Sequence, residues 1–134
     1  MSLTLNQAQM AVEASRQKAL DMGLKMNIAV VCAGGHLMAF ARMEGAWLGS
    51  VDIAIKKAKT ARYFDMPTGD LGKMSQPGEP LYGIEVTNQG LVSFPGGELI
   101  KDDSGEIIGA IGASGSTVDD DDKVAKAGVK ALAG

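Results

Sequence analysis

Apolar and polar positions follow a helical period most clearly between Ser50 and Phe64. At about 100° per residue, one face of this segment carries mostly small or apolar side chains, namely Ile53, Ala54, Lys57, Thr60, Ala61 and Phe64. Lys57 therefore lies in the middle of an apolar stripe. Such a lysine extends its ammonium to water, pairs with a carboxylate or enters a polar cavity. We expect a buried pair or a polar pocket, close to Arg42 or Glu44.

Two further helices are predicted at the ends of the chain. Leu3 to Met22 opens with a T-x-x-Q capping box, and Gly23 follows as a stop signal. Thr117 to Ala133 begins with an N-cap threonine, and four aspartates, Asp119 to Asp122, complement the helix dipole. This aspartate run lacks the alternating ligands and late glutamate of a calcium loop, so we interpret it as a solvated helix start.

Short apolar runs bounded by turn residues predict the strands. Met26 to Cys32 and His36 to Arg42, joined by an A-G-G turn, are typical of a β-hairpin. Three more strands are expected at Ile84 to Val86, Gly90 to Leu99 and Glu106 to Ser114. The D-D-S-G sequence before the last of them has the composition of a hairpin turn.

This order of elements predicts a single α+β domain over residues 1–134. The order is α-β-β-α-(short α)-β-β-β-α. Because the strands occur in runs joined by tight turns, we expect an antiparallel sheet of about five strands flanked by helices, not a doubly wound parallel sheet. Residues 66–82 are rich in proline and glycine and are expected to form a surface flap or a contact arm.

The glycine-rich sequence from Gly109 to Gly115 precedes the last helix, as phosphate-binding loops do. Its spacing is not G-x-G-x-x-G, no G-K-[ST] follows, and the aspartate run would lie where a phosphate must bind. We therefore expect these glycines to let a central strand run close to a packed helix.

Composition and charge narrow the classes of partner. The net charge is −3, with 13 basic and 16 acidic residues, so no basic excess indicates nucleic acid or an anionic membrane surface. No run of about 18 apolar residues is present. The lone Cys32 excludes an intrachain disulfide, and the absence of a signal segment favours a cytoplasmic protein.

The core must be built from small side chains. Aromatic residues make up 4% of the chain, whereas glycine occurs 18 times and methionine 8 times. Small side chains bury little area each, so association into a homo-oligomer is expected to add apolar burial. Methionine is interpreted as a flexible core filler.

Few residues suggest chemistry by themselves. His36 is the sole histidine, which excludes a metal site with several histidines, and no metal is expected. It follows a Gly-Gly turn, where its ring is either an ordinary exposed group or a functional one. Arg42 and Glu44 end the hairpin, as a surface pair or, with Lys57, as the rim of an anion-binding pocket. No spacing identifies catalytic residues, and a Ser-His-Asp triad is not supported.

Four segments, taken together and in order, resemble the GlcG/HbpS family of haem-binding or haem-degrading-like proteins. They are AGGHLMAFARMEGA (Ala33 to Ala46), IAIKKAKTA (Ile53 to Ala61), PGGELI (Pro95 to Ile100) and IIGAIGASG (Ile107 to Gly115). The family domain also forms the C-terminus of PduO-type corrinoid adenosyltransferases. The resemblance implies an antiparallel sheet flanked by helices, homo-oligomers and, in some members, binding of haem or a related tetrapyrrole.

Three functions follow as hypotheses. A haem-binding protein needs an axial ligand, an apolar slot and cations for the propionates; His36 is the first candidate ligand, and Thr60 or a methionine is the alternative. A protein that binds or converts a small organic acid, in glycolate or diol catabolism as the resemblance implies, would hold the carboxylate with Lys57 and Arg42 and use Glu44 as a base. The third is a non-catalytic oligomeric accessory protein. The candidate ligand-binding residues are His36, Arg42, Glu44, Lys57 and Thr60.

Overall fold

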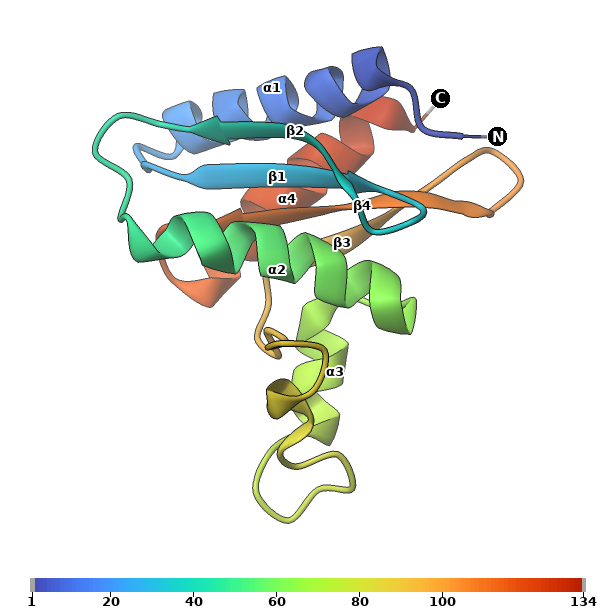
Figure 1. The fold of residues 1–134 in the computed structure, drawn as a ribbon. Helices are drawn as coiled ribbons and strands as arrows, with labels where there is room; N and C mark the ends of the chain where they lie inside the picture. The colour runs from blue at the N-terminus through green and yellow to red at the C-terminus, as the bar shows by residue number, and fades with distance from the viewer. Residues whose placement is uncertain (1, 134) are drawn as a thin grey trace.

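Four strands form one antiparallel sheet in the order β2-β1-β4-β3 (Figure 1). The computed structural model describes residues 2–133. The elements are α1 (Leu5–Asp21), β1 (Asn27–Cys32), β2 (Leu37–Arg42), α2 (Gly49–Phe64), α3 (Thr68–Met74), the 3-10 turn η1 (Ile84–Val86), β3 (Gly97–Lys101), β4 (Ile107–Ser114) and α4 (Val118–Leu132).

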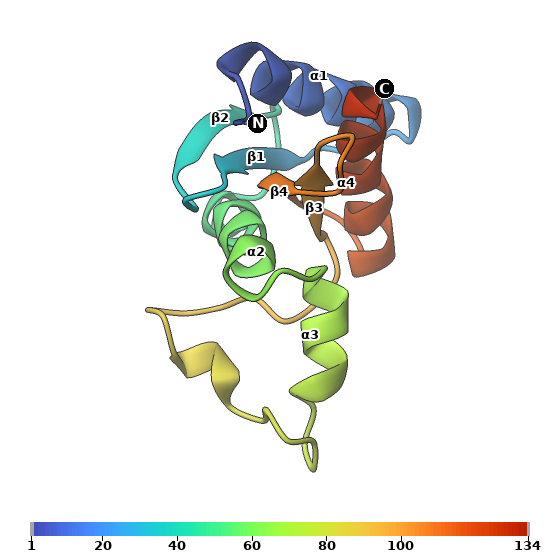
Figure 2. The same cartoon turned by 90° about the vertical axis from the view of Figure 1, so that its right-hand side faces the viewer.

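The helices cover both faces of the sheet. In Figures 1 and 2, α1 and α4 pack together on one face and α2 covers the other. Successive strand residues point to opposite faces, so Val30 and its partner Ile111 join the core beneath α1 and α4, whereas Val31 and its partner Ala110 pack under α2. The predicted α+β class with an antiparallel sheet is confirmed.

The predicted number of strands was too high by one. Ile84–Val86 is a 3-10 turn, and the segment from Gly90 is extended as a strand only from Gly97 onward. The physical reason is backbone conformation: Asn88, Gln89 and Gly90 all have positive φ (53°, 61° and 105°), which reverses the chain and interrupts an extended strand. Residues 65–96 instead form an arm that projects away from the sheet below α2 (Figure 2).

The helix ends follow the predicted capping chemistry. Thr4 Oγ1 accepts a hydrogen bond from Gln7 N at 3.1 Å, and Thr4 N donates to Gln7 Oε1 at 2.9 Å, which completes the capping box of α1. Thr117 Oγ1 accepts from Asp120 N at 3.1 Å at the start of α4. In the part of the chain that is described, no helix is long and apolar enough to cross a bilayer.

Glycines in β4 and α4 allow the helices to pack closely against the sheet, as predicted for the glycine-rich segment of β4. A Cβ at Gly112 of β4 would collide with the Ala54 carbonyl oxygen and lie 2.7 Å from Ala58 N, both in α2. On the other face, a Cβ at Gly128 of α4 would lie 2.5 Å from Ile111 Cδ1. Backbone therefore lies directly against backbone on the α2 face, which leaves no space for a ligand between that helix and β4.

Candidate functional site

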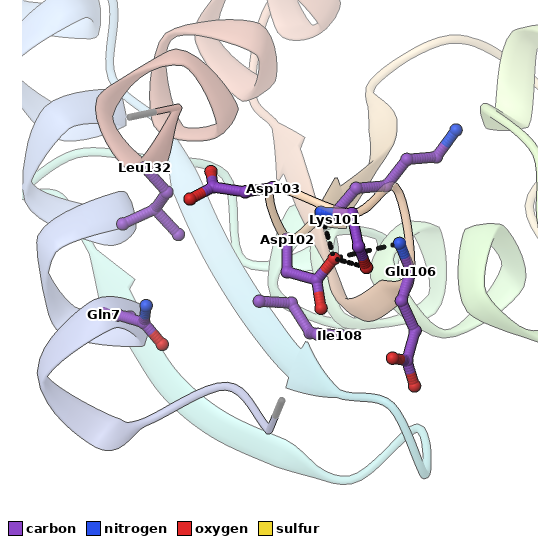
Figure 3. Close-up of a pocket in the computed structure, with 8 residues that line it drawn as sticks. Gln7, Lys101, Asp102, Asp103, Glu106, Ile108 and Leu132 are labelled. Carbon is purple, nitrogen blue, oxygen red and sulfur yellow. Dashed lines mark hydrogen bonds between the residues drawn. The ribbon is translucent and has the colours of Figure 1, made fainter.

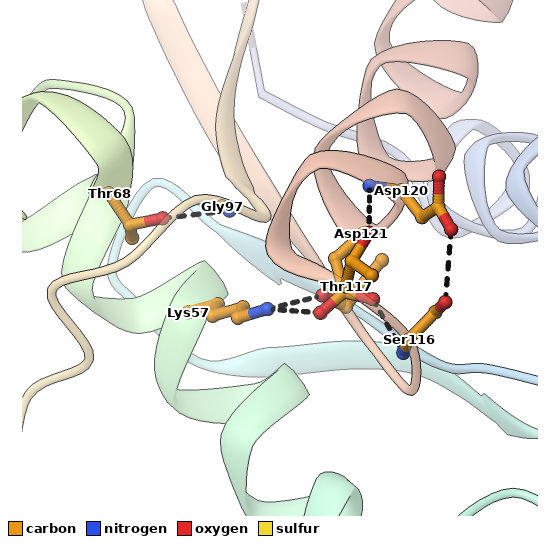
Figure 4. Close-up of polar contacts among 8 residues, drawn as sticks. Lys57, Thr68, Gly97, Ser116, Thr117, Asp120 and Asp121 are labelled. Carbon is orange, nitrogen blue, oxygen red and sulfur yellow. Dashed lines mark hydrogen bonds and ion pairs between the residues drawn. The ribbon is translucent and has the colours of Figure 1, made fainter.

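Lys57 lies at the centre of the polar interior. Its side chain is fully buried, and its Nζ donates to Asp121 Oδ2 at 2.9 Å and to the Ala113 carbonyl oxygen at 2.8 Å (Figure 4). The ammonium also lies 5.1 Å from the centre of the Phe94 ring, within cation–π range. The expected buried pair is confirmed, but the expected neighbours Arg42 and Glu44 were wrong.

Asp121 connects three elements through this pair. While one carboxylate oxygen holds Lys57 of α2, Oδ1 accepts from Ser116 N at 2.9 Å, in the turn between β4 and α4 (Figure 4). Burial lowers the pKa of Lys57 and raises the pKa of Asp121, while the pairing acts in the opposite direction on each group. The aspartate run is thus not merely a solvated helix start, because one of its members is a buried partner.

The helical period of α4 contained a signal for this pair. Asp121 shares a stripe with the buried residues Val124, Ala125 and Gly128, at spacings of three, four and seven. Lys57 shares the corresponding stripe of α2 with Ala54, Ala58 and Ala61. Two apolar stripes that each contain one charge of opposite sign predict a pair across the core.

Thr60 is buried and has a structural hydrogen bond. Its Oγ1 accepts from Val92 N at 3.1 Å, which attaches the segment that leads from the arm back to the sheet to α2. Thr68 at the start of α3 makes a similar contact with the first residue of β3, since its Oγ1 accepts from Gly97 N at 2.9 Å (Figure 4). A hydroxyl that is enclosed and already engaged is unsuited to ligating an external group.

His36 lies at the opposite extreme of exposure, on the turn between β1 and β2. His36 is exposed, and within residues 2–133 its ring makes no hydrogen bond or ion pair. The turn itself is held firmly: Arg62 of α2 donates to the Ala33 carbonyl oxygen, and a Cβ at Gly35 would lie 2.9 Å from Tyr63 Cε1. The exposed side chains of Leu37 and Tyr63 adjoin the same turn.

Arg42 and Glu44 lie at the other end of β2, where they line a cavity of about 320 Å³ beside α1. The predicted joint grip of Arg42 and Lys57 on a carboxylate is therefore wrong, because Lys57 is enclosed and bonded elsewhere. The five candidate residues occupy three places: the β1–β2 turn, the buried core under α2 and the cavity beside α1.

A cavity of about 450 Å³ lies between the β3–β4 turn and the ends of α1 and α4 (Figure 3). The polar groups nearest to it belong to the turn: Asp102 Oδ1 accepts from Ser104 N at 2.9 Å and from Glu106 N at 3.0 Å. The hydrogen bond from the Ser104 side chain has the largest effect in lowering the pKa of Asp102 below its ordinary value, and backbone hydrogen bonds add to it. This arrangement stabilises the predicted D-D-S-G hairpin turn.

A carboxyl pair that the sequence did not reveal lies between β3 and α4. Glu98 adjoins Asp122 in a cavity of about 270 Å³, and burial, followed by the contact with Asp122, raises the pKa of Glu98 to about 8. Asp122 Oδ2 lies 3.1 Å from Lys126 Nζ, while its buried Oδ1 has no hydrogen-bond partner among residues 2–133.

The fold defines a three-layer α+β protein, with helices on both faces of one antiparallel sheet. The chain belongs to the HbpS-like family, described as "Haem degrading protein HbpS-like", which matches residues 3–130. This membership confirms the resemblance seen in the sequence motifs.

Individual relatives agree with that assignment. The chain is 37% identical over 120 residues to the "Uncharacterized 15.0 kDa protein in dhaT-dhaS intergenic region" of Citrobacter freundii, covering 90% of this chain and 84% of that protein. It is 33% identical to the corrinoid adenosyltransferase PduO of Citrobacter freundii, covering 98% of this chain but only 39% of PduO. The crystal structure of a PduOC:Heme complex superposes with a TM-score of 0.94 at 32% identity, covering 99% of this chain and 96% of that chain.

Proposed function

We propose that this protein binds haem or a related tetrapyrrole and that His36 of the β1–β2 turn is the axial ligand. The observation that carries the proposal is an exposed imidazole that has no partner within residues 2–133 and stands on a turn fixed to α2. A metal ligand needs a free ring nitrogen and a fixed direction. Family membership and the likeness to the PduOC:Heme complex support the choice of ligand.

The surroundings of His36 fit a flat apolar ligand. Leu37 and Tyr63 are 47% and 46% exposed, so their side chains offer apolar and aromatic contact surface beside the turn. Lys59 lies one helical turn before Tyr63 on α2 and can reach a propionate. Bound haem supplies its iron, and this chain supplies the ligand, the contact surface and the cation.

We further propose that the protein works as a homo-oligomer. Trp47 and Leu48, in the loop before α2, are 66% and 78% exposed, and Tyr82 and Val86 on the arm are 68% and 86% exposed. Exposed apolar side chains in such numbers favour burial against a second copy. A cytoplasmic location stays a prediction, supported by the unpaired Cys32.

A haemin titration tests the first proposal. The wild-type protein is expected to shift the Soret band with saturable stoichiometry, and His36→Ala to abolish the shift. Cys32→Ser and Tyr63→Phe are the matched controls, since they remove the other potential ligands near the turn but leave His36 in place. A wild-type spectrum that does not respond to haemin contradicts haem binding, and a normal spectrum from His36→Ala excludes this residue as the ligand.

Native mass spectrometry tests the second proposal. A single species at the chain mass of 13.9 kDa, at micromolar concentration, contradicts a homo-oligomer. If the protein forms oligomers and responds to no ligand, the accessory role is favoured over both binding functions.

A further inference from the structure

The cavity beside α1 is built from three separate segments of the chain. Arg16 and Leu20 come from α1, Lys25 from the α1–β1 loop, and Arg42 and Glu44 from the end of β2 and the loop that follows it. Its volume of about 320 Å³ is at the lower end of the range of roughly 300–1,000 Å³ for small-molecule sites. A small ligand fits this space, whereas a tetrapyrrole does not.

The charge of the cavity is opposite to that of the protein. Three cations line it against one carboxylate, Glu44, although the chain carries a net charge of −3. Within residues 2–133, neither the Arg42 nor the Lys25 side chain has a hydrogen-bond or ion-pair partner. Such cations are available to an external anion.

The third cation is held in place by its own helix. Arg16 donates from Nε to Glu13 Oε2 at 2.8 Å and from a terminal nitrogen to Glu13 Oε1 at 2.7 Å. This bidentate contact uses part of the guanidinium and fixes its plane, which leaves further N–H groups free to donate. Glu44 lies close enough to contribute to the raised pKa of Arg16, after the larger effect of Glu13.

Apolar side chains form part of the cavity wall. Met43 is buried, and its sulfur accepts from Met26 N at 3.4 Å. Leu20, Leu24 and Ala41 complete the apolar lining. Lys25 is exposed, and its side chain runs alongside Gly45, where an added Cβ would lie 3.0 Å from Lys25 Cδ.

We propose that this cavity binds a small carboxylate with a short apolar body, with Arg42 as the principal carboxylate-binding residue and Lys25 as its support. The planar guanidinium matches the two oxygens of a carboxylate, and the apolar part of the cavity wall accepts the hydrocarbon part of the ligand. The site is independent of the proposed haem ligand, because His36 and Arg42 lie at opposite ends of β2.

The test uses acetate, propionate and butyrate as ligands, with sodium chloride at equal ionic strength and butanol as the uncharged analogue. Thermal unfolding and calorimetry are expected to show saturable binding that strengthens from acetate to butyrate. Arg42→Met is expected to weaken the affinity at least about tenfold, the loss of a charged hydrogen bond. Glu44→Gln is expected to strengthen it, because a repelling charge is removed.

Lys101→Met is the matched control, since this exposed cation lies outside the cavity and its loss is expected to change nothing. His36→Ala is expected to bind carboxylates normally, which separates a failure here from a failure of the haem proposal. Stabilisation by chloride equal to that by butyrate, an unchanged affinity in Arg42→Met, or an equal loss in Lys101→Met each overturns the proposal.

Discussion

Replacing Lys57 by methionine is the sharpest test of the structure. The substitution keeps the length and apolar stem of the side chain but removes the ammonium that Asp121 Oδ2 and the Ala113 carbonyl oxygen contact at 2.9 and 2.8 Å. The Asp121 side chain is only 3% exposed, so its charge remains in the interior without its partner. We expect Lys57→Met to lower the free energy of unfolding by more than the same substitution at an exposed lysine does.

The magnitude follows from the burial of both partners. Breaking a buried ion pair by removing one member costs about 3–5 kcal/mol, which is a large part of the roughly 5–15 kcal/mol that stabilises a typical domain. The surface pair formed by Lys56, the residue before Lys57, and Asp52, 3.2 Å apart on α2, is the matched control. Pairs of that kind contribute about 0.3–0.5 kcal/mol, so Lys56→Met is expected to change stability very little.

Urea denaturation at neutral pH measures both differences. A second variant, Asp121→Asn, keeps an oxygen for the hydrogen bond from Ser116 N but removes the charge. The double variant Lys57→Met/Asp121→Asn is therefore expected to be more stable than Lys57→Met alone, because no unpaired carboxylate remains buried. If Lys57→Met costs no more than Lys56→Met, or if the second substitution restores nothing, the buried pair is not what the structure implies.

Two further perturbations address the sheet. Because Glu98 has a pKa of about 8 instead of 4.5, the folded state holds a proton that the unfolded state releases, so the free energy of unfolding is expected to fall as pH rises from 4.5 to 8. Urea titrations at several pH values should show a smaller fall for Glu98→Gln. The control variant Glu79→Gln, at an exposed position, should show the same fall as the wild type. Gly112→Ala is expected to cost about 1–3 kcal/mol or more in thermal unfolding, since its Cβ would collide with α2, whereas Gly49→Ala, with open space around the added carbon, should be tolerated.

The elements that were predicted correctly are those with local chemistry of their own. The capping box at Thr4, the N-cap at Thr117 and the helical period of α2 all depend on residues within a few positions of one another. The β1–β2 hairpin and β4 likewise carry their turn and glycine signals in sequence. These local signals were sufficient to specify the α+β class.

The strand predicted within the arm was wrong because backbone conformation, and not the hydrophobic pattern, determines the structure of this segment. Ile84 and Val86 are β-branched and alternate with Glu85, as is typical of a strand, yet the positive φ values from Asn88 to Gly90 turn the chain before a partner strand can form. Asparagine and glycine adopt such angles more readily than other residues, whereas glutamine rarely does, so the positive φ of Gln89 could not be expected from residue type. The carboxyl pair of Glu98 and Asp122 was missed for a different reason, since it depends on the packing of α4 against β3.

The structure also explains why ligand chemistry should be sought at the ends of β2 and not beneath α2. The interior face of α2 is filled by the close contact with Gly112 and by the bonded ammonium of Lys57. Opening that layer would separate Lys57 from Asp121, and breaking a buried ion pair is costly. The exposed ring of His36 and the exposed guanidinium of Arg42 need no such opening. A ligand that binds to either group leaves the core intact, so Lys57→Met is expected to lower stability without changing the affinity for haemin or carboxylates at temperatures where the variant stays folded.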